Sequence, residues 1–105
     1  MIDKLDKKIK LTNFGLAEKI DPEGGIIGYC GTLEYLAPEV EINRGAYNEK
    51  SDMWSLGVIM YAMLTKKFPF TNKKREPFKI RAMIQEGKYD TDSKNSAHKY
   101  TMCRY

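Results

Sequence analysis

The first group of residues that could do chemistry is a triplet that follows a short alternating stretch at 8–12: Asn13, Phe14 and Gly15. The amide oxygen of Asn13 is a hard ligand, but it carries no charge to balance a divalent cation such as Mg²⁺. Asparagine also accepts the backbone angles of turns comfortably. The triplet is therefore predicted to be a turn, and no metal ligand is assigned to it.

Cysteine and histidine are too sparse to indicate a zinc site. Cys30 and Cys103 lie far apart and form no C-x-x-C pair, and His98 with Cys103 would supply at most two of the four ligands that structural zinc takes. Separated cysteines fit a reducing compartment, and the N-terminus has no apolar secretory segment. We expect a cytoplasmic, intracellular location.

The charge pattern also limits the class of partner. The net charge is +4, and the densest basic cluster is Lys73-Lys74-Arg75. No aromatic platform or recognition motif accompanies it, so a solvated loop is a better interpretation than a nucleic-acid patch. Neither nucleic acid nor a membrane is expected as a partner.

The element that must position the chemical groups is an apolar stretch at about 51–65. Its apolar residues cover nearly every side of a helical wheel, which predicts a central helix buried on all sides. It is too short to cross a bilayer, which takes about 17–25 apolar residues. Ser51 is the predicted N-cap, and Asp52 suits the positive end of the helix dipole, as a cap rather than a catalytic acid.

The remaining segments complete a mainly α fold with at most one small domain. Alternation predicts a strand at 8–12 with Ile9 and Leu11 toward a core, and a vestigial hairpin over 8–17. Turn formers predict an exposed loop at 18–31.

Two further helices are predicted from their end signals. A helix at 38–44 would open with proline and stop at Gly45, and another at about 77–86 would open with proline and close at Gly87. The tail at 90–105 is left without a firm assignment.

Four motifs, in order, resemble part of the catalytic domain of a eukaryotic protein kinase. Residues 10–15 resemble the strand and D-F-G metal loop with Asn in place of Asp, and 31–39 resemble the end of the activation segment. Residues 52–57 resemble the start of the central large-lobe helix, and 68–70 the turn after it. The residues of these motifs resemble those of serine/threonine kinases, and more loosely those of the calcium/calmodulin-dependent-kinase-like group. The resemblance makes Asn13, with Phe14 and Gly15, a degenerate cofactor-binding position. The activation-segment end is marked by Gly31, Thr32, Ala37, Pro38 and Glu39, and the central-helix motif by Asp52, Trp54 and Gly57.

The resemblance implies a partial kinase large lobe over 1–105, with an activation segment at 13–39. The family transfers the γ-phosphoryl group of ATP, held with Mg²⁺, to serine or threonine of a protein substrate. The 105 residues contain no G-x-G-x-x-G, V-A-I-K or H-R-D motif, and Asn13 replaces the metal-binding Asp. We expect no catalytic residue and no cofactor for this chain alone.

Two positions gain expected roles from the resemblance. Thr32 matches the threonine that lies near the catalytic Asp and the substrate in active kinases; with no such Asp in these 105 residues, we expect it only to shape the loop. Glu39 matches the glutamate that pairs with an arginine of a later helix, and we expect that partner to be missing here.

Three interpretations stay open from the sequence. The favoured one is a piece of a serine/threonine kinase, because residues 1–3 resemble the segment just after the catalytic loop. The second is a shortened pseudokinase that binds a protein partner, which Asn13 motivates. The third is an unrelated small helical protein. Under the first, we expect a marginally stable chain with Trp54 and its neighbours forming an exposed apolar patch.

Overall fold

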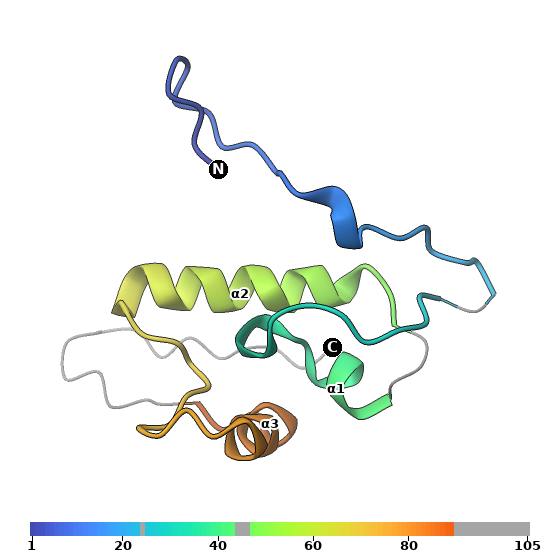
Figure 1. The fold of residues 1–105 in the computed structure, drawn as a ribbon, viewed down its shortest axis with the longest axis vertical. Helices are drawn as coiled ribbons and strands as arrows, with labels where there is room; N and C mark the ends of the chain where they lie inside the picture. The colour runs from blue at the N-terminus through green and yellow to red at the C-terminus, as the bar shows by residue number, and fades with distance from the viewer. Residues whose placement is uncertain (24, 44–46, 90–105) are drawn as a thin grey trace.

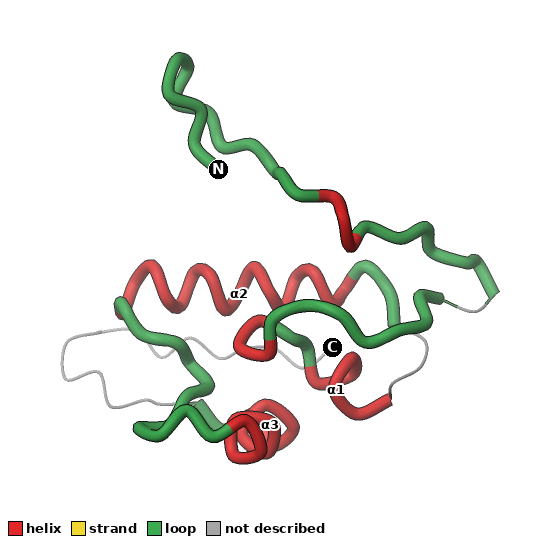
Figure 2. Tube along the Cα trace, in the orientation of Figure 1, coloured by secondary structure: helices red, strands yellow, loops and turns green. Residues whose placement is uncertain are grey.

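The computed structural model describes residues 1–23, 25–43 and 47–89, whose path runs through three α-helices (Figure 1). Over these residues, Figure 2 shows helices and loops and no strand. The mainly α fold is therefore confirmed. The elements in chain order are the 3-10 helix η1 (Phe14–Leu16), the 3-10 helix η2 (Leu33–Tyr35), α1 (Pro38–Asn43), α2 (Lys50–Thr65) and α3 (Pro77–Glu86).

The longest helix, α2, begins one residue before the predicted start, and its cap differs from the prediction. Ser51 lies inside the helix, so its assignment as N-cap is wrong. The N-cap position is Glu49, whose side chain makes no capping bond. One residue earlier, Asn48 Oδ1 accepts the backbone N–H of Lys50 at 3.0 Å. At the other end Lys66 adopts a left-handed conformation, and its N–H donates to the carbonyl of Ala62 at 2.8 Å.

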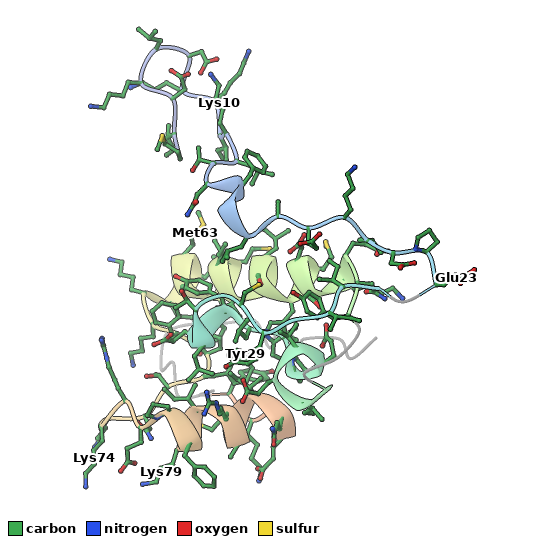
Figure 3. All side chains as sticks on the ribbon, turned by 45° about the vertical axis from the view of Figure 1, so that its right-hand side comes forward. Lys10, Glu23, Tyr29, Met63, Lys74 and Lys79 are labelled. Carbon is green, nitrogen blue, oxygen red and sulfur yellow. The ribbon has the colours of Figure 1, made fainter. Side chains whose placement is uncertain are left out.

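The expectation that α2 is buried on all sides is also wrong. Only Ser51 and Val58 are buried on this helix. Figure 1 shows α1, η2 and α3 on one side of α2, and Figure 3 shows Met63 on the other side. We call that uncovered side the outer face; its large apolar side chains are 42–76% exposed: Met53, Leu56, Ile59, Met60, Met63 and Leu64.

The core lies on the covered side of α2 and consists of two clusters. The first contains Val58 from α2, Phe70 from the following turn, and two α3 residues one turn apart, Ile80 and Ile84. The second joins the end of η2 to α1 and contains Leu36, Ala37 and Val40.

Trp54 packs against both clusters and joins them. Its ring stacks on Phe70, with 5.4 Å between the ring centroids and 9° between the planes. Because the ring is half-buried in this way, the expectation that Trp54 belongs to an exposed apolar patch is wrong, although the outer face provides such a patch without it.

Helix α3 has the bounds that its end signals predicted. Pro77 occupies its first turn, where a missing backbone N–H leaves no hydrogen bond unmade. Gly87 closes the helix in a left-handed conformation, with its N–H directed to the carbonyls of Met83 and Ile84. Local signals were sufficient here because each acts within about one helical turn.

The N-terminal segment forms neither the predicted strand at 8–12 nor a hairpin over 8–17, where residues 14–16 are a 3-10 helix instead. Its β-structure is reduced to a single antiparallel bridge between Ile2 and Ile9. Ile9 and Leu11 are 83% and 84% exposed, so neither faces a core. The alternating pattern had no apolar surface to pack against, since every residue from 11 to 20 is exposed.

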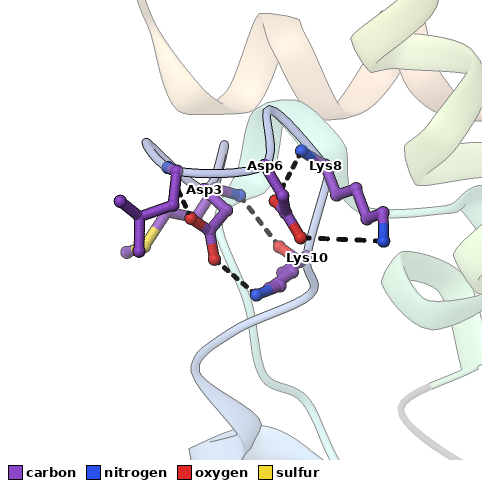
Figure 4. A network of polar contacts seen from close by, with 6 residues as sticks. Asp3, Asp6, Lys8 and Lys10 are labelled. Carbon is purple, nitrogen blue, oxygen red and sulfur yellow. Dashed lines mark hydrogen bonds and ion pairs between the residues drawn. The ribbon is translucent and has the colours of Figure 1, made fainter.

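Local polar contacts shape the first ten residues instead (Figure 4). Lys10 forms an ion pair with Asp3, and this contact lowers the pKa of that carboxyl below its usual value of 3.8. Asp6 accepts the backbone N–H of Lys8 at 2.9 Å. These contacts stabilise a local turn, and they do not extend the Ile2–Ile9 bridge into a strand.

Some predictions fall outside the described residues. Gly45 as the stop of the helix that begins at Pro38, and the tail at 90–105 with His98 and Cys103, are among them. Over the part of the chain that is described, no helix is both long enough and apolar enough to span a bilayer.

Phe70 provides a test of this core. Phe70→Ala removes the ring under Trp54, and we expect the free energy of unfolding to fall by about 3–5 kcal/mol because a cavity remains. Phe78→Ala is the matched control, since that ring is 82% exposed and its loss should change stability by less than about 0.5 kcal/mol. Urea unfolding followed by the fluorescence of the single tryptophan measures both. Equal effects of the two substitutions would contradict the assignment of Phe70 to the core.

Candidate functional site

The Asn13 triplet lies at the start of η1, away from the helices. Asn13 has φ 64° and ψ 66°, the left-handed region in which asparagine is one of the few tolerated side chains. The predicted turn role of Asn13 is therefore confirmed. Phe14 and Gly15 are exposed beside it, and Figure 1 shows this part of the chain leading away from the three helices.

The donor atoms around Asn13 do not fit a Mg²⁺–triphosphate group. Asn13 offers one neutral amide oxygen, whereas magnesium in such sites is held through carboxylates and phosphates. Within residues 1–23, 25–43 and 47–89, no three or more His, Cys, Asp or Glu residues gather where they could hold a metal ion.

The second predicted group, at 31–39, is packed onto the core. Thr32 is exposed and precedes η2, while Leu36 and Ala37 are buried immediately after it. Gly31 has φ 115°, a conformation that disfavours side chains, and a Cβ at this position would lie 3.0 Å from Leu36 Cδ2. A glycine therefore permits the close turn that brings Thr32 over the core.

Two serine hydroxyls of α2 hold this segment. Ser51 Oγ donates to Glu39 Oε1 at 2.8 Å, and Ser55 Oγ donates to the carbonyl of Tyr35 at 2.9 Å. The two serines lie one helical turn apart, so they present hydroxyls on the same face of α2. The structure thus brings the predicted 31–39 and 52–57 groups together.

The predicted residues of the 52–57 group lie in different environments. Trp54 packs under the segment, Gly57 is half-buried, and Asp52 is exposed in the first turn of α2. Asp52 makes no side-chain capping bond, but its charge suits that end of the helix. Among the described residues, Glu39 has the Ser51 hydroxyl as its partner in place of an arginine.

A polar cluster that the sequence analysis missed holds the loop before this segment. Tyr29 Oη donates to Glu41 Oε2 at 2.9 Å, and Arg81 Nε lies 2.7 Å from Glu41 Oε1. Arg81 Nη2 also donates to Tyr29 Oη at 3.3 Å, and its contacts with Tyr29 and then Glu41 raise the pKa of Arg81. Figure 3 labels Tyr29, which is 44% exposed.

A second contact that was missed joins the same loop to the start of α2. Ile26 and Tyr47 exchange backbone hydrogen bonds of 2.8 and 3.0 Å. Cys30 Sγ lies 3.7 Å from Tyr47 Oη, and this contact, followed by burial, raises the pKa of Tyr47 above its usual 10.0. No local motif signals pairs such as Ile26–Tyr47 and Cys30–Tyr47. The two serines of α2 that hold the 31–39 segment could have been found from the sequence, because Ser51 and Ser55 have the i, i+4 spacing of one helical face.

The comparisons with known proteins agree with this geometry. A family model described as "Protein kinase domain" matches residues 1–103. "Ribosomal protein S6 kinase alpha-6" of Mus musculus is 52% identical over 68 residues, which are 64% of this chain. "Ribosomal protein S6 kinase alpha-3" of Homo sapiens and "Ribosomal protein S6 kinase 2 alpha" of Xenopus laevis are each 51% identical over 69 residues, or 65% of this chain. The matched stretch covers 9% of the length of each relative.

The contact between Ser51 and Glu39 can be measured by a double-mutant cycle. We expect Ser51→Ala and Glu39→Ala to show a coupling of about 1.5–3 kcal/mol, because the hydrogen bond has one charged partner and is partly buried. Urea unfolding of the parent, both single variants and the double variant provides the value.

The matched control pairs Ser51→Ala with Glu23→Ala, which removes an exposed carboxylate of the 18–31 loop. Those two effects should add within about 0.5 kcal/mol. A Ser51–Glu39 coupling no larger than this control would show that the hydroxyl does not hold the segment.

Proposed function

Because this chain belongs to the protein kinase domain family, we propose that it forms part of the large lobe of a protein serine/threonine kinase. The whole protein would transfer the γ-phosphoryl group of ATP, with Mg²⁺, to serine or threonine of a protein substrate. The identity of about half of the matched residues to ribosomal protein S6 kinases supports this proposal. So does the Gly31-Thr32 pair ahead of Ala37-Pro38-Glu39, which resembles serine/threonine kinases.

The observation that carries the proposal is the attachment of the 31–39 segment to α2. Phosphoryl transfer depends mainly on positioning and on electrostatic stabilisation, so a kinase must hold its substrate-facing segment still. Here the hydroxyls of Ser51 and Ser55 and the ring of Trp54 hold that segment from below. Thr32 stays exposed above them. In this proposal the segment orients the substrate, with Thr32 at its accessible edge.

We further propose that the 105-residue chain alone neither holds ATP tightly nor transfers phosphate. The support is the chemistry of Asn13, an exposed neutral amide where the resemblance places a metal-binding carboxylate. The ATP and Mg²⁺ of the family reaction, the protein substrate and a cytoplasmic location belong to the proposal for the whole protein.

Nucleotide titration tests this. Calorimetric addition of ATP with Mg²⁺ to the purified chain should show no saturable binding with a Kd below about 1 mM. Asn13→Asp is the matched variant, and it should not bind either, because one carboxylate supplies only part of a magnesium site. Mg²⁺-dependent micromolar binding by the parent chain would overturn the proposal, and an active serine/threonine kinase serves as the positive control.

The outer face of α2 favours a second candidate function, a shortened pseudokinase that binds a protein. Six large apolar side chains are exposed along this single helix, which is more than scattered surface residues account for. A monomeric chain with a cooperative thermal transition would support this candidate, and aggregates that no partner rescues would count against it.

A further inference from the structure

The connection between α2 and α3 carries a concentrated positive charge beside an exposed aromatic ring. Figure 3 shows Lys74 and Lys79 projecting from the same edge of the molecule. Phe78, next to Lys79 in the first turn of α3, is 82% exposed. We define the basic turn as these exposed side chains together: Lys73, Lys74, Arg75, Phe78 and Lys79.

Hydrogen bonds order the backbone of the basic turn. The N–H of Arg75 donates to the carbonyl of Asn72 at 3.0 Å, and the N–H of Glu76 donates to Asn72 Oδ1 at 2.9 Å. Arg75 is held at φ 49°, a left-handed conformation that side chains adopt only when surrounding contacts require it. The cations are therefore presented from one fixed turn, with less backbone entropy to lose on binding.

The charge of the basic turn is only partly balanced. Glu76 is the one carboxylate within residues 72–79, and it pairs with Lys79. Over the described ranges, Lys73, Lys74 and Arg75 take part in none of the ion pairs. Four cations and one anion leave an excess of +3 here, most of the net +4 of the whole chain.

We propose that the basic turn is a docking surface for an acidic protein segment that carries an apolar residue among its carboxylates. The cations complement the carboxylates, and the ring of Phe78 supplies the apolar contact on which such interfaces centre. This inference goes beyond the proposed kinase function and does not depend on it, because the surface is present whether or not the chain takes part in phosphoryl transfer.

The same observations favour a protein segment over a nucleic acid or a membrane. Single-stranded nucleic acid binds along extended grooves that carry several stacking rings, whereas the basic turn has one ring. Membrane surfaces attract clusters of about four to eight cations that lie beside a membrane-spanning helix or on an amphipathic helix. The basic turn carries one ring and four cations on a short turn, and in the described part of the chain no helix beside it is long and apolar enough to span a bilayer.

The test uses the full chain and a short fluorescein-labelled peptide of Glu and Asp with a central Leu. Fluorescence anisotropy compares the parent with a variant carrying Lys73→Glu, Lys74→Glu and Arg75→Glu. The matched control carries Lys4→Glu, Lys7→Glu and Lys19→Glu, three exposed lysines outside the basic turn. Each variant replaces three positive charges by three negative ones, so both move the net charge from +4 to −2.

We expect the basic-turn variant to bind at least about tenfold more weakly, because three ion pairs are replaced by repulsion, and the control to lose less than about threefold. Phe78→Ala should weaken binding at every salt concentration without changing the salt dependence, since it removes no charge. Equal losses of affinity in the two triple variants would overturn the proposal. An unfolded chain that binds the peptide through its net charge alone would give this result. Tighter binding of a single-stranded RNA or of phosphatidylserine vesicles would overturn it as well.

Discussion

The stack of Trp54 on Phe70 is the contact on which the rest of the packing depends. The Trp54 ring packs against both apolar clusters, so it fixes α2 relative to α1 through one cluster and relative to α3 through the other. Its Nε1 is buried and has no hydrogen-bond partner among the described residues. Shape and apolar contact thus hold the ring in place, and a polar bond does not.

This central contact explains why the two parts of the 13–39 segment differ. Its end at 31–39 lies over Trp54 and is also held by the hydroxyls of Ser51 and Ser55. Its beginning at 13–20 contacts no comparable surface and is exposed throughout. The covered side of α2 thus gives the 31–39 segment a defined position.

The two sides of α2 have different consequences for function. The covered side builds the core, whereas the outer face exposes apolar side chains that only another protein surface or another part of a protein could bury. The basic turn follows the C-terminal end of α2 in the chain, and its surface is mainly positively charged, whereas the outer face is apolar. The chain therefore presents two chemically distinct surfaces, and a partner for one is not expected to fit the other.

The sequence by itself determined the features whose signals act over about one helical turn. Pro77 and Gly87 marked the ends of α3, the apolar run marked α2, and the motif wording indicated the family. Part of the site was predictable in the same way, because the residues of 31–39 form one uninterrupted motif and those of 52–57 form another.

Only the tertiary structure decided which side of α2 is covered, that Ser51 anchors Glu39 and does not cap the helix, and that residues 8–12 form no strand. The cluster of Tyr29, Glu41 and Arg81 joins residues 12 and 52 positions apart. Burial and such long-range pairs depend on which surfaces meet in space, and helical periodicity and capping residues carry no information about that.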